Sequence, residues 1–111
     1  MLRQDVLRNK KDFDRLYKKG AKVHGKYLVV IFLKNGTDEN RKAFLASKKV
    51  GKAVARNRAR RLMKEAFRSL APRVKSGYDI LFIARNTILN AKCREVTDSM
   101  TVSLKKGKLF T

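Results

Sequence analysis

The sequence is poor in the residues from which proteins build disulfides, metal sites and active sites. It contains one cysteine, Cys93, and one histidine, His24. A single cysteine excludes an intrachain disulfide and a thiolate cluster for zinc, and we expect Cys93 to be a small core residue. A lone histidine near a strand start is typical of a surface or partly buried position. Asp38 and Glu39 lie in a predicted turn, which favours turn chemistry over a pair of catalytic acids.

Long apolar runs and phosphate-binding glycine loops are also missing. No stretch is long and uncharged enough to span a membrane, and the absence of tryptophan leaves no amphipathic helix with bulky anchors. Residues 1–10 carry charges throughout, unlike a secretory signal. Gly51 stands alone rather than in a glycine-rich loop. We therefore expect a cytoplasmic protein that does not bind membranes.

Acidic residues are scarce relative to basic ones. The 111 residues include 29 Lys and Arg against 9 Asp and Glu, a formal net charge of +20. Self-repulsion of that size opposes a compact isolated state, so a neutralising partner is expected. A hydrophobic content of 43% argues against disorder, and the length suits one domain, residues 1–111, with a modest core. Nucleic acid is the commonest partner for such a domain.

The cations are densest in residues 47–70, SKKVGKAVARNRARRLMKEAFRSL. A helix from Ala53 would gather one apolar stripe, formed by Ala55, Ala59, Leu62, Met63, Ala66, Phe67 and Leu70. Repulsion between cations on the rest of its surface costs a few tenths of a kcal/mol per pair, and guanidinium groups bind phosphate oxygens in pairs. We therefore favour a polyanion site over a merely solvated basic face. The candidate cations are Lys48, Lys49, Lys52, Arg56, Arg58, Arg60, Arg61, Lys64 and Arg68.

The rest of the chain predicts an α+β sandwich in the order helix, strand, strand, helix, strand, helix. The predicted first helix follows Asn9 and ends at Gly20, and residues 1–8 are expected to be loose. The predicted strands are 23–33, 41–47 and 78–84, and an Asn-Gly signal in 34–40 predicts a hairpin turn. A last helix, capped by Asn86 or Asn90, would bury Leu89, Cys93, Val96, Met100 and Leu104 and end at Gly107.

Two aromatic residues of the first helix have two possible roles. Phe13 and Tyr17 fall on one edge of that helix together with Leu16. They could stack on unpaired bases or pack in the core. The residues alone leave both readings open.

The run KKVGKAVARNRARRLMKEAF resembles the signature of the bacterial ribonuclease P protein subunit. It matches an ordered pattern of S-K-K-x-G, then A-V-x-R-N-R, then a basic helix with an apolar end. The segments KKDFDRLYKKG, YDILFIAR and CREVTDSMTVSL resemble the first helix, a later strand and the last helix of that family. The similarity therefore covers nearly the whole chain.

The resemblance implies a protein cofactor of a ribozyme. In that family, a catalytic RNA with bound Mg²⁺ removes the 5′ leader of precursor tRNA, and the protein binds both the RNA and the leader. The protein would have no active site of its own and need no protein partner. Carried over by position, Arg56, Asn57, Arg58, Arg60 and Arg61 with the neighbouring lysines would meet the catalytic RNA. Phe13, Tyr17, Val29 and Ile31 would form the leader groove.

The resemblance also implies a left-handed crossover from the strand at 41–47 through the basic helix to the strand at 78–84, against the usual hand. Two positions depart from the family pattern. Several relatives carry an aromatic residue at the position of Ile31, and many have a proline at Asn86–Thr87. Whether acidic residues such as Asp5 or Asp12 help to hold a metal ion is left open.

Two other functions are compatible with the composition. One is an RNA-binding module without catalytic association, such as a ribosomal protein or an RNA chaperone. The other is an autonomous nuclease, which would need clustered carboxylates or histidines to hold a metal or activate water. The sequence offers no such cluster, and the ordered motif favours the ribonuclease P subunit over the general RNA-binding module.

Overall fold

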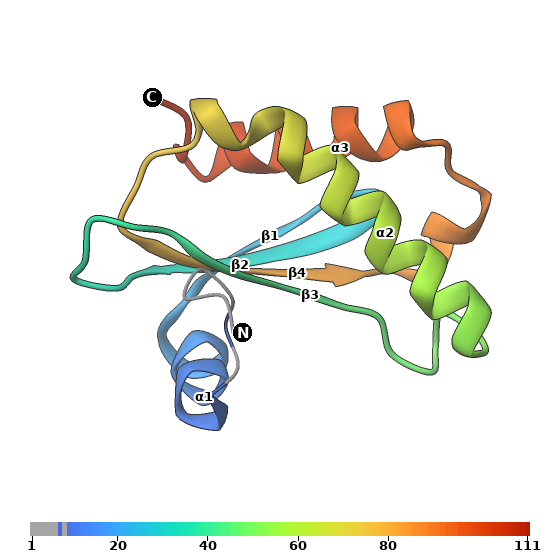
Figure 1. The fold of residues 1–111 in the computed structure, drawn as a ribbon, viewed down its shortest axis with the longest axis horizontal. Coiled ribbons are helices and arrows are strands. Elements are labelled where there is room, and N and C mark those ends of the chain that lie inside the picture. Colours follow the sequence, from blue (N-terminus) through green and yellow to red (C-terminus); the bar gives the residue numbers. More distant parts are fainter. Residues whose placement is uncertain (1–6, 8) are drawn as a thin grey trace, which may run out of the picture.

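The computed structural model describes residue 7 and residues 9–111, which form three α-helices and one four-stranded sheet (Figure 1). In chain order the elements are α1 (Lys10–Lys19), β1 (Ala21–His24), β2 (Leu28–Lys34), β3 (Arg41–Leu45), α2 (Ala53–Leu70), the short 3-10 helix η1 (Ala71–Arg73), β4 (Tyr78–Ala84), the 3-10 helix η2 (Asn86–Asn90) and α3 (Cys93–Lys106). The predicted α+β sandwich is confirmed.

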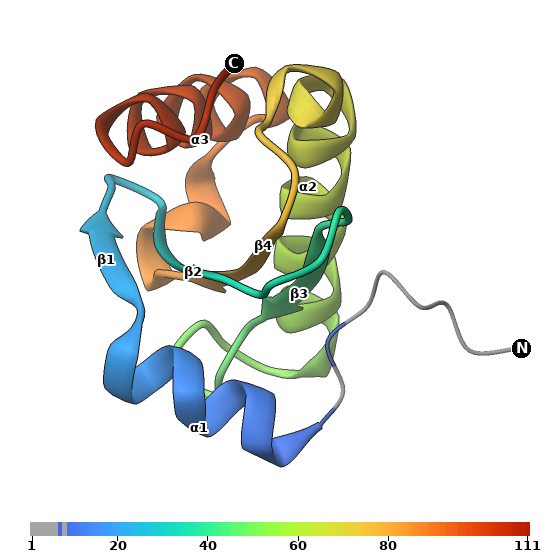
Figure 2. The same ribbon diagram turned by 90° about the vertical axis from the view of Figure 1, so that its left-hand side faces the viewer.

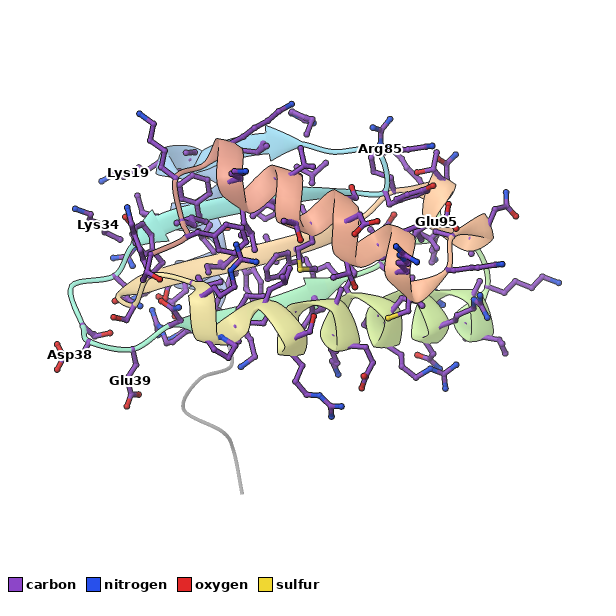
Figure 3. The ribbon with its side chains drawn as sticks, turned by 90° about the horizontal axis from the view of Figure 1, so that it is seen from above. Lys19, Lys34, Asp38, Glu39, Arg85 and Glu95 are labelled. Carbon is purple, nitrogen blue, oxygen red and sulfur yellow. The ribbon has the colours of Figure 1, made fainter. Side chains whose placement is uncertain are left out.

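The sheet is mixed, with strand order β1-β2-β4-β3. β2 runs antiparallel to both of its neighbours, whereas β3 and β4 are parallel and are joined through α2. Figure 3 views the sheet from the side of α2 and α3. If β3 and β4 are turned to point upward in that view, β4 lies to the left of β3 with α2 in front. The crossover is therefore left-handed, as the family resemblance implies and against the general rule.

Helices cover both faces of the sheet. α2 and α3 lie on one face and α1 on the other (Figures 1 and 2). Side chains alternate between the two faces along each strand, so Phe82 belongs to the larger core under α2 and α3, while Leu81 belongs to the smaller core under α1. In the larger core Phe82 stacks on Phe44, with ring centroids 5.1 Å apart.

The predicted strand at 23–33 is wrong in one respect, because it is two strands. β1 and β2 pair antiparallel across a turn, in which the backbone N–H of Gly25 donates to the carbonyl of Leu28 at 2.9 Å. A Cβ at Gly25 would lie 2.8 Å from Ser103 Oγ of α3, so the turn needs glycine to approach the helix. Exposed His24 lies just before this turn, at the end of β1.

The predicted hairpin between the strands at 23–33 and 41–47 is also wrong. The Asn-Gly turn forms locally, with Gly36 at φ 74°, but β2 and β3 do not pair, because β4 lies between them. β4 is the most buried strand, and a strand covered on both faces is best placed in the middle of a sheet. Asp38 and Glu39 lie at the tip of the β2–β3 loop, away from the helices (Figure 3).

The basic helix matches its prediction, and the last helix matches in part. α2 begins at Ala53 and buries Ala59, Met63, Ala66, Phe67 and Leu70. α3 ends at Lys106, with Gly107 as its C-cap, and buries Val96, Met100 and Leu104, but it begins at Cys93 rather than at Asn86 or Asn90. Leu89 is exposed in η2 and Cys93 is exposed in the first turn of α3, so neither is a core residue. Ile88 and Ala91 fill this part of the core instead.

Thr87 ties the segment that leads into α3 to the sheet. Its hydroxyl donates to the carbonyl of Lys26 at 2.6 Å, which ties η2 to the β1–β2 turn. Arg85 Nη1 donates to the carbonyl of Gly25 at 2.8 Å and holds the same turn.

The predicted loose segment, residues 1–8, lies mostly outside the described residues. Leu7 is described and is not loose. It is 3% exposed in the core under α1, and its backbone N–H donates to the carbonyl of Lys42 on β3 at 2.9 Å.

Candidate RNA interface

The cations of α2 lie on two sides of the helix. Arg56, Arg60, Lys64 and Arg68 follow one another at intervals of four, so each is the neighbour of the next. They form a row that winds by about 120° around the helix between its first and last member; this set is called the edge row below. Lys64 and Arg68 line the same hollow as Phe44 of β3, so the row borders the β3 edge of the sheet. Arg58 and Arg61 are exposed on the outer side of the helix, at the level of Arg56 and Arg60.

Arg56 has an unusual environment for a surface cation. It is half-buried, and its Nε is buried with no hydrogen-bond partner in the described part of the chain. A buried donor without an acceptor costs about 1–3 kcal/mol. One turn later, Arg60 Nη2 donates to Asn57 Oδ1, so the motif residue Asn57 orients a neighbouring guanidinium.

The N-terminus of α2 concentrates positive charge. The N-cap residue Lys52 makes no side-chain cap hydrogen bond, and the first turn of Ala53–Leu70 contains no acid. The first N–H groups of a helix lack intrahelical acceptors and carry the positive end of its dipole. Lys48 and Lys49 are exposed in the turn that leads to this end. An anion such as phosphate is the ligand that satisfies this arrangement.

The predicted leader residues occupy different depths on the α1 face of the sheet. Tyr17 is 44% exposed, while Phe13 and Val29 are half-buried. Ile31 is 2% exposed in the core under α1, where it supports the helix rather than offering a surface.

Leu45 and Ile83 were not among the predicted leader residues. They are half-buried on the same face of the sheet, packed against the small core under α1. The alternation of side chains along 41–47 and 78–84 could have placed them there.

A hollow of about 650 Å³ joins the two regions across the edge strand β3. Leu7 and Phe13 line it on the α1 side. Lys64, Glu65, Phe67, Arg68 and Ala71 line it on the α2 side, where Arg68 Nη2 lies 3.4 Å from Glu65 Oε2. β3 supplies the floor, with Lys42, Ala43, Phe44 and Leu45. An apolar floor beside cations suits a single nucleic acid strand, whose bases pack on the floor while its phosphates face the cations.

An ionic cluster beneath α1 was not predicted. Asp79 of β4 is 0% exposed and accepts hydrogen bonds from Arg41 Nε at 2.8 Å, Arg41 Nη2 at 2.7 Å and Asn35 Nδ2 at 3.1 Å. The hydrogen bonds to Asp79 raise the pKa of the Arg41 guanidinium above its ordinary value. Two residues of α1 join the pair, since Arg15 Nη2 lies 3.3 Å from Asp79 Oδ2 and Asp12 Oδ2 lies 3.2 Å from Arg41 Nη1.

Two further observations concern metals and membranes. Among the described residues, no group of three or more His, Cys, Asp or Glu side chains is placed to hold a metal ion. None of the helices in residues 9–111 is both long and apolar enough to cross a bilayer.

Comparison with known proteins gives one consistent result. The model of the Ribonuclease P family matches residues 1–108. The ribonuclease P protein component of Alkaliphilus oremlandii is 44% identical over 104 residues, which cover 94% of this chain and 91% of that protein. The Staphylococcus aureus RNase P protein superimposes with a TM-score of 0.87 at 31% identity, covering 98% of this chain and 100% of that one. The Thermotoga maritima RNase P protein gives 0.83 at 31% identity, with coverages of 93% and 97%.

Proposed function

The chain belongs to the ribonuclease P protein family, and on this premise we propose that it binds the catalytic RNA of ribonuclease P and the 5′ leader of precursor tRNA. It thereby assists the endonucleolytic removal of the leader that yields the mature 5′ end. The observation that carries this proposal is the hollow across β3, which connects Phe13 of α1 with Lys64 and Arg68 of α2.

The proposed division of work places the catalytic centre in the RNA. The interface described above consists mainly of guanidinium, ammonium, aromatic and aliphatic groups, which bind phosphates and bases. Glu65 adds a carboxylate at the hollow, and this carboxylate is paired with Arg68. Guanidinium groups stay protonated at any physiological pH, so they do not serve as general bases. Mg²⁺, bound mainly by the RNA, would supply the activation of water at the scissile phosphate. The protein's part is to hold the leader and to offset repulsion between leader and RNA phosphates, which lowers the ion concentration required.

The leader would lie on the α1 face and continue over β3. Tyr17 offers an exposed ring for stacking, and half-buried Phe13, Val29, Leu45 and Ile83 offer apolar contact. We propose that the edge row meets the leader phosphates, while the outer cations and the α2 N-terminus meet the catalytic RNA. This holoenzyme would act in the cytoplasm and need no further protein.

The test is cleavage of a precursor tRNA with a 5′ leader at low Mg²⁺, by a bacterial ribonuclease P RNA with and without this protein. We expect a large gain only when both are present. Cleavage by the protein alone would indicate a nuclease site in the chain. Absence of a gain in every arm would contradict the proposal and favour a general RNA-binding module.

The leader contact is tested in the same assay with Tyr17→Ala. We expect weaker binding of precursor tRNA and unchanged binding of mature tRNA, because the mature form lacks the strand that the ring contacts. Val102→Ala is the matched control, since Val102 is an exposed apolar residue of α3 outside the proposed interface. Equal losses for both tRNA forms would contradict the assignment of Tyr17 to the leader.

A further inference from the structure

α1 is held on the sheet by little apolar contact. Its ten residues, KKDFDRLYKK, include three apolar side chains, of which Leu16 alone is buried. Leu16 and half-buried Phe13, which packs against the same small core, attach one edge of the helix to the sheet. The rotation of the helix and its position along the sheet decide where the rings of Phe13 and Tyr17 point.

Electrostatics would otherwise push α1 away. The helix carries five cations against two acids, a net charge of +3, in a protein of net charge +20. Unpaired, it would be repelled by the rest of the molecule. The ionic cluster of Asp12, Arg15, Arg41 and Asp79 is neutral in sum, so it offers attraction at one defined place.

The cluster combines two residues of the sheet with two residues of α1. Arg41 and Asp79 face each other across the parallel pair β3–β4 and form a bidentate guanidinium–carboxylate contact. The register of the two strands holds both residues in place. Arg15 and Asp12 reach this pair from α1, three residues apart on the helix and with opposite charges. Arg15 pairs with Asp79 and Asp12 pairs with Arg41. Because these two contacts have opposite charges, exchanging them would place like charges together, so they favour one rotation and one direction of the helix.

We propose that this cluster positions α1 for leader recognition, which makes Asp12 and Arg15 positioning residues for Phe13 and Tyr17. The inference rests on the proposed function, since the leader is the ligand whose binding depends on those rings. Asp12 and Arg15 need not touch RNA for this role. They act through the orientation of the helix that carries the rings.

The experiment uses the double variant Asp12→Asn/Arg15→Gln in the reconstituted holoenzyme. It removes both ion pairs from α1 to the sheet but leaves the Arg41–Asp79 pair intact and the net charge unchanged, so we expect the variant to fold. The matched control is Lys11→Gln/Asp14→Asn, which makes the same charge changes at the same spacing on exposed residues of α1. A conservative double variant, Asp12→Glu/Arg15→Lys, keeps both charges and should restore binding.

Three readouts separate positioning from general stability. The ratio of Kd for mature tRNA to Kd for precursor tRNA should fall roughly fivefold in the test variant, the size expected from losing two partly exposed ion pairs. KM for the precursor should rise while kcat at saturation stays unchanged. Amide hydrogen exchange should become faster in α1 and not in α2 or α3.

The outcomes discriminate clearly. A tRNA ratio equal to that of the control variant, or equal losses for both tRNA forms, would overturn the positioning role. If the wild-type protein itself shows no preference for precursor over mature tRNA, the proposed function fails. In that case hydrogen exchange still reports separately whether the cluster fixes α1.

Discussion

At the scale of single residues, Arg56 gives the sharpest expectation. Its buried Nε lacks an acceptor in the described part of the chain, so the free protein bears the cost of an orphan donor. Arg56→Met removes that donor and keeps much of the apolar stem. We expect the free variant to be as stable as the wild type or more stable, by up to about 1 kcal/mol, while RNA binding weakens. Urea unfolding and filter binding measure the two effects.

The control for Arg56 is Arg58→Met, two residues later on the exposed outer side of α2. It should weaken RNA binding without changing the stability of the free protein. A clear loss of stability in Arg56→Met would show that the guanidinium already has a partner before RNA binds. A gain in stability, together with a greater loss of RNA binding than in Arg58→Met, would support RNA as the source of the missing acceptor.

Residue type and spacing predicted the basic side chains of α2 but not the cluster around Asp79. The cations lie within one continuous helix, so the 3.6-residue period places them directly. Arg41 and Asp79 become neighbours only because β3 pairs parallel with β4, 38 residues further along the chain. The prediction that Cys93 is a core residue was wrong for a local reason, since Cys93 is the first residue of the helix and is exposed there. Periodicity gives the face of a helix and not its first residue.

At the scale of elements, the two sides of α2 should differ in what they bind. Lys64 and Arg68 border the hollow that Phe13 lines, whereas Arg58 and Arg61 lie on the outer side. Lys64→Ala/Arg68→Ala and Arg58→Ala/Arg61→Ala remove the same charge from the same helix. In both variants, the slope of log binding constant against log salt concentration should become shallower by about one to two units. Only the Lys64/Arg68 variant should also reduce the preference for precursor over mature tRNA.

Titration of each variant against the catalytic RNA, precursor tRNA and mature tRNA at several salt concentrations checks this. Equal loss of leader preference in both variants would mean that the helix binds RNA as one uniform surface. An unchanged salt slope in both would remove α2 from the interface altogether.

Glu95, in the first turn of α3, should contribute to the stability of the folded protein in a pH-dependent way. Glu95 accepts hydrogen bonds from the backbone N–H of Lys92 at 3.0 Å and from the Tyr27 hydroxyl at 3.1 Å, and these lower its pKa below the ordinary value of 4.5. A lowered pKa means that the ionised form stabilises the fold. The contribution is complete above about 4.5 and is lost as the pH falls through the lowered pKa.

Glu95→Gln should therefore be less stable than the wild type at pH 7, and the difference should shrink on acidification and vanish once Glu95 is protonated. Urea unfolding at pH 7 and pH 3 measures it. Asp98→Asn is the control, an exposed acid three residues later on α3. A difference that persists unchanged at pH 3 would contradict the role of the charge.

The bounds of the helices and strands could be predicted from the sequence more accurately than the order of the strands in the sheet. Helix α2 and strand β4 have the predicted bounds because each has a clear hydrophobic pattern and a Gly or Pro near one boundary, Pro72 after α2 and Gly77 before β4. The order β1-β2-β4-β3 was not derivable, since an Asn-Gly turn specifies a local reversal and not which strand pairs next. The left-handed crossover was available only through the family resemblance, because elementary rules favour the other hand.

At the scale of the whole molecule, composition alone predicted that the partner is a polyanion. The location of the proposed binding site became visible only in the folded structure. A net charge of +20 identifies a polyanion as the partner but is spread over the surface. The fold adds the apolar hollow at β3 and the rings on α1, which turn a general attraction into a place for an unpaired strand. Neither feature could be assembled from the sequence without the positions of β3 and β4.

The same charge makes the free protein sensitive to salt. The Debye length is about 30 Å at 0.01 M salt and about 10 Å at 0.1 M, and the radius of gyration is 13.1 Å. At 0.01 M, repulsion therefore acts across the whole folded molecule and is weaker in the expanded unfolded chain. We expect Tm to rise by several degrees between 0.01 and 0.2 M NaCl, measured by circular dichroism.

Sulfate at equal ionic strength should raise the Tm further in the wild type and less in Arg56→Met, because a divalent oxyanion can accept a hydrogen bond from the Arg56 Nε donor. A flat or falling Tm would mean that the surface cations are already balanced within the fold, and that RNA is not needed to neutralise them.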